Sequence, residues 1–160
     1  MIYIGVDVGK SGALAIIYED STTKVLDFDD PELLLELSDI NEPVIAYIEK
    51  VSSMPNQGVA STFSFGTNYG WWQGVMDALG IPYELVRPQE WMKSLTIPTP
   101  IKKPTKEQKS QNLKARKKAI NDTARRLFPK EELVTHRGRI LDGRSDALMI
   151  ANYARKTYDR

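Results

Sequence analysis

Short apolar runs alternate with amphipathic stretches along this chain, and their order predicts a sheet covered by helices. Residues 1–8 read as an apolar strand, residues 9–12 as a glycine-containing turn, and residues 13–18 as a returning strand. Three further segments have strand character: 24–28, 44–48 and 83–86. With helices between the later strands, this order predicts an α/β fold with a mixed five-stranded sheet.

The helical segments carry start and stop signals of their own. Asp30 followed by Pro31 predicts a first helix, because aspartate caps helix N-termini and proline fits the first turn. A second helix is expected over residues 57–79, either continuous or interrupted near Gly66. The remaining segments are helices over 87–95, 105–128 and 145–158, with proline-rich loop 96–104 between the first two.

The composition fits one globular domain spanning residues 1–160. Hydrophobic residues make up 41% and charged residues 27% of the 160 positions, close to globular averages. With no cysteine, disulfides, zinc–thiolate centres and thiol nucleophiles are excluded. The chain starts without the pattern of a signal peptide, and no apolar run approaches the ~20 residues of a membrane span. A cytoplasmic protein with no membrane partner is therefore expected.

The net charge of +1 conceals a strong separation of charge along the chain. The segment 102–126 is basic, with only Glu107 and Asp122 opposing its cations. These cations are Lys102, Lys103, Lys106, Lys109, Lys114, Arg116, Lys117, Lys118, Arg125 and Arg126. Such a stripe is the electrostatic footprint of phosphate binding, although a simply solvated helix face would look the same.

Carboxylates stand where the hydrophobic pattern does not expect them. Asp7 and Glu49 each end an apolar strand, and parallel neighbouring strands would bring both to one edge of the sheet. Asp142 and Asp146 are four residues apart, on one side of a helix start, and an apolar helix follows them. Four carboxylates from three elements can therefore converge.

Clustered carboxylates repel one another unless a cation lies between them. Oxygen ligands suit Mg²⁺ or Mn²⁺, and two such ions could support phosphodiester hydrolysis. Structural roles remain open at each position: Asp7 could form a turn, Asp142 could cap a helix, and Glu49 could pair with a lysine.

Taken together, the chain resembles the RuvC-like resolvases of the RNase H-like superfamily, above all their phage-borne branch. Five ordered blocks carry the resemblance: GVDVGKSGALA from residue 5, AYIEKV from 46, YELVRPQEWMKSL from 83, KSQNLK from 109 and DGRSDALMIANYA from 142. It implies that Asp7, Glu49 and Asp146 are metal ligands and that Asp142 takes a variable fourth acidic position. Lys109 matches a lysine near the DNA backbone.

The resemblance also implies a function. Such proteins are homodimeric endonucleases that cut branched DNA, such as Holliday junctions, with two Mg²⁺ or Mn²⁺ ions per site and leave 5′-phosphate and 3′-hydroxyl ends. A phage-encoded member would act in the cytoplasm of a bacterial host. The residues expected to bind DNA are Lys109, Lys114, Lys117, Lys118, Ser52 and Met54. Ser52 stands where the bacterial pattern has an aromatic stacking residue, which puts strict junction specificity in doubt.

Aromatic residues fall at helical spacing in the segment 63–72. Phe63, Phe65, Tyr69, Trp71 and Trp72 are read as core plus dimer interface, and base stacking is the minority reading. Trp91 and Met92 are expected to pack the short helix after the fifth strand. Three other functions remain open: an actin-like small-molecule kinase, a non-catalytic branched-DNA-binding protein, and a nuclease or transposase for another substrate.

Overall fold

The core of the protein is a mixed five-stranded sheet with the strand order β3-β2-β1-β4-β5. The computed structural model describes residues 1–51 and 58–159. The strands are β1 (Ile2–Asp7), β2 (Ala13–Ile17), β3 (Thr23–Asp27), β4 (Val44–Glu49) and β5 (Tyr83–Val86). β1, β4 and β5 are parallel, whereas β2 is antiparallel to both of its neighbours. The predicted mixed sheet is confirmed, and β1 lies at its centre.

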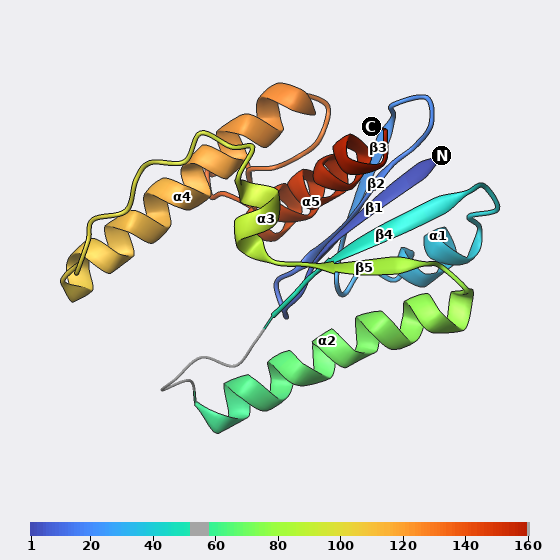
Figure 1. Ribbon diagram of the computed structural model, residues 1–160, viewed down its shortest axis with the longest axis horizontal. Helices are drawn as coiled ribbons and strands as arrows, with labels where there is room; N and C mark the ends of the chain where they lie inside the picture. Colours follow the sequence, from blue (N-terminus) through green and yellow to red (C-terminus); the bar gives the residue numbers. More distant parts are fainter. Residues whose placement is uncertain (52–57, 160) are drawn as a thin grey trace.

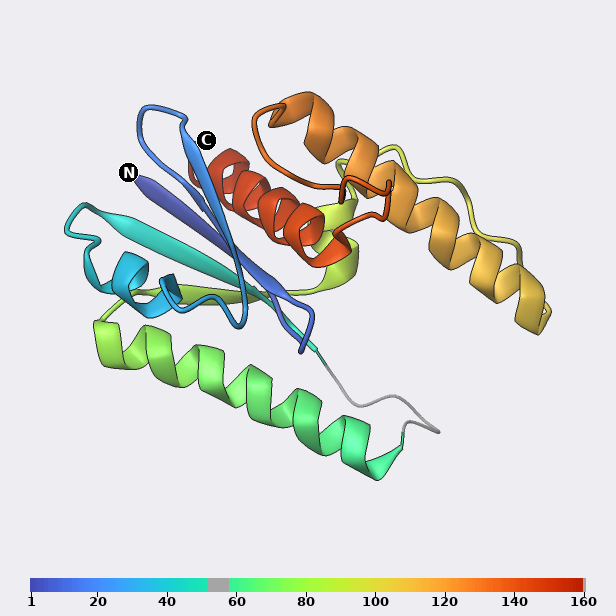
Figure 2. The ribbon, with the colours of Figure 1, turned by 180° about the vertical axis from the view of Figure 1, so that it is seen from behind.

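Helices cover both faces of this sheet (Figures 1 and 2). α1 and α2 lie on one face, while α3, α4 and α5 lie on the other. Their bounds are α1 (Leu33–Ser38), α2 (Val59–Leu79), α3 (Pro88–Met92), α4 (Lys106–Leu127) and α5 (Asp142–Tyr158). No helix in the described ranges is long and apolar enough to cross a membrane.

Both faces of the central strand are buried because alternate β1 side chains enter opposite cores. Ile2, Ile4 and Val6 pack beneath α1 and α2, while Tyr3 joins the core under α5. At Gly5 the backbones of β1 and α5 nearly touch. An added β-carbon there would lie 2.2 Å from the Ala147 carbonyl oxygen. The absence of a side chain therefore brings α5 directly onto the centre of the sheet.

Several helix boundaries differ from those expected from the sequence. α5 begins at Asp142 rather than residue 145, and α3 ends at Met92 rather than residue 95. α2 runs unbroken through Gly66 and ends at Gly80, whose positive φ of 67° allows the reversal of the chain. α1 starts two residues later than Pro31, and the Asp30 carboxylate instead accepts a hydrogen bond from the Glu32 amide at 2.9 Å.

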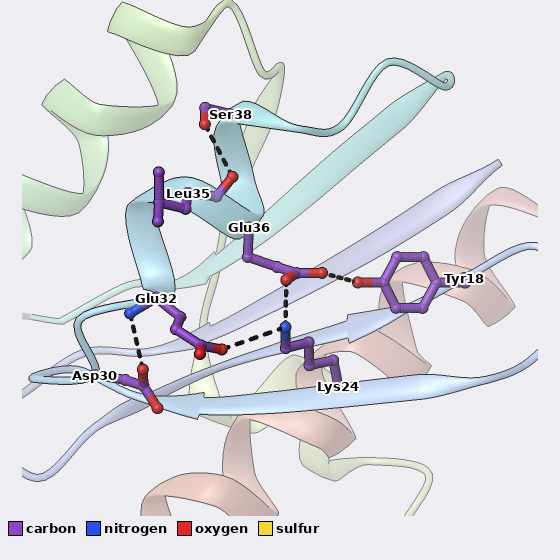
Figure 3. A network of polar contacts seen from close by, with 7 residues as sticks. All are labelled: Tyr18, Lys24, Asp30, Glu32, Leu35, Glu36 and Ser38. Carbon is purple, nitrogen blue, oxygen red and sulfur yellow. Dashed lines mark hydrogen bonds and ion pairs between the residues drawn. The ribbon is translucent and has the colours of Figure 1, made fainter.

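A polar network ties α1 to the edge of the sheet (Figure 3). The Glu36 carboxylate accepts hydrogen bonds from the Tyr18 hydroxyl and the Lys24 ammonium group. Glu32 lies 3.8 Å from the same ammonium group. Burial and the bond to Glu36 raise the pKa of Tyr18, whereas Lys24 and Tyr18 lower the pKa of Glu36. This part of the acidic N-terminal third therefore stabilises the fold locally.

Candidate active site

The parallel pairing of β1 and β4 brings two carboxylates to one edge of the sheet. Val6 pairs with Ile48, so that Asp7 and Glu49, the last residues of their strands, follow side by side. The two carboxyl groups influence each other: Glu49 helps to raise the pKa of Asp7, whereas the interaction with Asp7 lowers the pKa of Glu49. The sequence-based expectation of a shared edge thus matches the observed topology.

The first turn of α5 brings the other two carboxylates to the same place. Asp142 is the first residue of α5, and Asp146 lies one turn further along. Gly143 between them lies against the turn that follows β1. A β-carbon at Gly143 would come within 2.2 Å of the Ser11 carbonyl oxygen and 3.2 Å of Asp7 Oδ2. Because only glycine fits there, the start of α5 can rest directly on Asp7.

Burial and mutual repulsion make these carboxylates difficult to ionise. The pKa of Asp7 is raised well above its usual range, first by burial and then by the charges of Asp146, Glu49 and Asp142. Burial is also the main cause that raises the pKa of Asp146, to about 7, with Glu49 and Asp142 contributing. The four side chains therefore act as one electrostatic group.

The pKa of Glu49 is raised overall, although two neighbours oppose the effect of burial. Burial raises its pKa, whereas a hydrogen bond from Trp91 and the charge of Arg116 lower it. The Trp91 indole Nε1 donates to Glu49 Oε1 at 3.1 Å. Glu49 thus has two neighbours that favour its charged form even without a metal ion.

The chemistry of this group fits a divalent cation, although its geometry is not that of a formed metal site. All four donors are carboxylates, and Asp146 Oδ1 is shielded from solvent with no hydrogen-bond partner in the described residues. No three acidic, histidine or cysteine side chains within residues 1–51 and 58–159 are already arranged to hold one ion. A bound cation would relieve the repulsion by drawing the carboxylates together.

Cations from α4 border this acidic group. Lys117 forms an ion pair with Asp142, and Lys118 pairs with Asp122 on its own helix at 2.5 Å. Lys109 and Lys114 are exposed and form no ion pair with the described residues. The N-terminal half of α4 extends beyond the sheet (Figures 1 and 2), which leaves these lysines on an open surface.

Two neighbouring hollows meet at Arg116. A cleft of about 920 Å³ is lined by two carboxylates, Glu49 and Glu90, and by four cations: Lys50, Arg87, Lys93 and Arg116. A smaller hollow of about 250 Å³ lies between α4 and the segment 97–100, and it is lined by Lys109 and again by Arg116. The basic lining therefore continues from the predicted DNA-binding lysine to one of the carboxylates.

Two residues beside the carboxylates were not predicted as site residues from the sequence. In the sequence, Arg116 is one of many cations in the basic segment 102–126. Its position seven residues after Lys109, and therefore on the same helix face, is the signal that could have identified it. Trp91 was expected merely to pack, and nothing in its local pattern reveals the contact with Glu49 across the sheet edge. Ser52 and Met54, both predicted to contact DNA, lie outside the described residues.

Comparison with known proteins identifies the fold through structure alone. No protein-family model and no curated protein matches the sequence. A structure titled "T. thermophilus RuvC in complex with Holliday junction substrate" superposes with a TM-score of 0.62 at 14% identity, covering 100% of this chain and 96% of that one. A second Thermus thermophilus RuvC structure gives 0.53 at 16% identity, covering 98% and 97%. The chain therefore shares the fold of these RuvC structures over its whole length.

Proposed function

We propose that this protein is a metal-dependent, structure-specific endonuclease that cleaves branched DNA such as Holliday junctions. The observation that carries the proposal is the convergence of Asp7, Glu49 and Asp146 from two parallel strands and a helix, next to a basic cleft. The RuvC-like fold supports the same proposal, since the T. thermophilus RuvC structure that superposes on this chain is a complex with a Holliday junction substrate.

Each acidic side chain has a role in this proposal. Asp7, Glu49 and Asp146 would hold Mg²⁺ or Mn²⁺, and Asp142 would join them once it leaves Lys117. When bound, two such cations supply Lewis-acid stabilisation of the attacking and leaving oxygens of the phosphodiester. The protein contributes carboxylate oxygens as hard ligands, and hydrolysis would leave 5′-phosphate and 3′-hydroxyl ends.

The basic surface of α4 would hold the DNA backbone. Lys109, Lys114 and Arg116 are exposed cations on one helix, and Arg116 lines the cleft that leads to Glu49. Lys117 and Lys118 are partly neutralised by aspartates and would bind phosphate after exchanging those partners. Phosphate contacts of this kind position a duplex without reading its sequence.

A homodimer completes the proposal, because paired cuts in one junction require two active sites. α2 presents large apolar side chains to solvent: Val59 is 87% exposed and Phe63 is 77% exposed. Exposed apolar groups on one helix are suited to an interface between two copies of the chain. Such a dimer would pair two sites across its twofold axis.

A cleavage assay tests the enzymatic claim. Labelled four-way junction, Y-fork and plain duplex are incubated with the full chain in Mg²⁺, in Mn²⁺ or in EDTA. We expect metal-dependent cutting of branched substrates, and we expect Asp7→Asn to bind junctions without cutting them. Asp39→Asn, which removes an exposed carboxylate far from the cluster in sequence, serves as the matched control and should cut normally.

The outcomes separate the alternatives. Junction binding without cutting in either metal would favour a non-catalytic DNA-binding protein. Full cutting by Asp7→Asn would remove that residue from the active site. Equal cutting of plain duplex and branched DNA would leave a nuclease but exclude structure specificity.

A further inference from the structure

The short helix α3 presents a buried indole group to one of the candidate metal ligands. Trp91 is only 2% exposed and belongs to the core beneath α5. Its Nε1 donates a hydrogen bond to Glu49 Oε1 at 3.1 Å, within the ordinary range for such bonds. This core side chain therefore touches the candidate site directly.

Packing alone does not require such a contact in this protein. Trp72 is fully buried on the opposite face of the sheet, and its indole nitrogen has no hydrogen-bond partner among the described residues. The fold thus accepts one buried indole N–H without a partner. The hydrogen bond from the Trp91 indole to Glu49 is therefore not explained by burial of the indole alone.

The surrounding backbone holds Trp91 and Glu49 in fixed relation. β4 and β5 pair up to Glu49 and Val86, and the Lys50 amide then donates to the Val86 carbonyl oxygen at 2.6 Å. α3 begins directly after β5 with Pro88 in its first turn, and the Glu90 carboxylate accepts from the Arg87 amide at 2.8 Å. The indole is therefore positioned by a capped helix and a strand pair.

We infer that Trp91 is a positioning residue that holds the Glu49 carboxylate in the orientation needed to ligate a divalent cation. The inference rests on the proposed function, since it assigns a supporting role at the same site. The indole N–H occupies one acceptor position of Oε1 and leaves the other lone pairs of the carboxylate available. Hydrogen bonds that orient metal ligands in this way are a recurring feature of metal sites.

Metal affinity, measured without DNA, tests this role. Mn²⁺ is titrated calorimetrically into the metal-free full chain as wild type, Trp91→Phe and Trp72→Phe. Both variants lose the same atoms from a buried site, but only Trp91→Phe loses a hydrogen bond. We expect Trp91→Phe to weaken Mn²⁺ binding by about 10- to 100-fold, and Trp72→Phe to leave it unchanged.

Equal Mn²⁺ affinity for the two variants would overturn the positioning role, as would a wild-type protein that binds no Mn²⁺. Junction binding in EDTA should be the same for all three proteins, and a loss confined to Trp91→Phe would indicate a structural defect and overturn the inference. A wild-type protein that binds Mn²⁺ but cuts no branched DNA contradicts only the proposed function. The two claims therefore fail by different measurements.

A second measurement does not depend on the folding of Trp91→Phe. The chain contains three tryptophans, and the indole N–H signals can be assigned by nuclear magnetic resonance with Trp71→Phe and Trp72→Phe, which leaves Trp91 by elimination. We expect Glu49→Ala to move the Trp91 indole proton upfield, because its acceptor is lost. A Trp91 signal unchanged in Glu49→Ala would show that the hydrogen bond is not formed.

Discussion

At the scale of single residues, the candidate site holds buried carboxylates whose negative charges repel one another. Asp7 and Asp146 have raised pKa values because burial and neighbouring carboxylates both disfavour their charge. Ionisation of these groups therefore lowers the free energy of unfolding of the metal-free protein.

The stability of the metal-free protein should consequently fall as the pH rises. A carboxyl whose pKa is raised on folding stabilises the fold below its unfolded pKa, and this stability is lost as the pH rises through the folded pKa. For Asp146 the loss extends from about 4 to about 7, the value in the folded protein. Thermal unfolding in EDTA should give a lower Tm at pH 8 than at pH 5.

Substitution of the buried carboxyl should remove part of this pH dependence. We expect Asp146→Asn to raise the Tm at pH 8 by about 3 °C or more, the shift that ~1 kcal/mol produces in a chain of this size. The exposed Asp39→Asn should leave the Tm nearly unchanged. A Tm for Asp146→Asn that follows the wild type at both pH values would contradict the assigned burial.

The sequence reveals the candidate site carboxylates more readily than it reveals the side chains that contact them. Asp7 and Glu49 stand out because each ends an apolar strand with an acidic side chain, and this conflict with burial can be recognised in the sequence alone. The contacts of Trp91 with Glu49 and of Lys117 with Asp142 span 42 and 25 residues. Such pairs depend on how separate elements pack, which local patterns do not encode.

At the scale of elements, glycines set the distance between α5 and the sheet. Gly5 lets α5 approach β1, and Gly143 lets the start of α5 rest on the 11–12 turn. The expected helix start at residue 145 was wrong because the signals considered were local. The observed start at Asp142 accompanies this close packing on Asp7 and the turn.

A single methyl group at Gly5 should therefore be strongly destabilising. The β-carbon of Gly5→Ala would lie 2.2 Å from the Ala147 carbonyl oxygen and 2.3 Å from the Ala151 amide nitrogen. Because backbone atoms cannot move aside cheaply, we expect a loss of about 3 kcal/mol or more in the free energy of unfolding. Denaturant unfolding measures it.

Gly74 in α2 provides the control, because an added β-carbon there meets nothing within 4 Å. We expect Gly74→Ala to be neutral or to stabilise by about 0.5–1 kcal/mol through reduced backbone entropy. Similar stabilities for the two variants would mean that α5 does not lie this close to β1.

The unbroken course of α2 was one of two alternatives left open by the sequence. Gly66, Gly70 and Gly74 weaken helix propensity, but all three lie within the continuous helix. Trp72 and Met76 are fully buried against the sheet, and their packing outweighs the local cost. Burial of these side chains in the tertiary structure, rather than local helix propensity, therefore accounts for the continuity of α2.

At the scale of the whole molecule, charge is separated between an acidic edge and a basic arm. The acidic side includes the network of Glu32 and Glu36 at α1. On the other face of the sheet, α4 carries eight lysines and arginines against two acidic residues. A near-neutral total is therefore compatible with binding to a polyanion.

Neutralising two of these cations should change the salt dependence of DNA binding. We expect Lys109→Gln with Lys114→Gln to weaken junction binding at all sequences and to reduce the slope of log affinity against log salt by about 2. The control is Lys156→Gln, at the far end of α5 from Asp142. Fluorescence anisotropy over a salt series measures the slope, and an unchanged slope would exclude α4 from the interface.

The proposed dimer is also a property of the whole molecule. We expect Phe63→Glu to convert a dimer into an 18.1 kDa monomer in sedimentation velocity, because the variant buries a charge in the interface. Leu35→Glu alters a similarly exposed side chain on α1 and should remain dimeric. A monomeric wild type, or a dimeric Phe63→Glu, would remove α2 from the assembly.

The near contact of β1 and α5 at Gly5 joins the candidate site to the folding core. Asp7 and Asp146 are carried by the two elements whose backbones meet there, so they cannot separate while the sheet remains packed. Heat should therefore abolish the proposed nuclease activity at the temperature of global unfolding, without a range in which a folded protein is inactive. Substitutions that stabilise the core would raise the upper temperature limit of that proposed activity by the same amount.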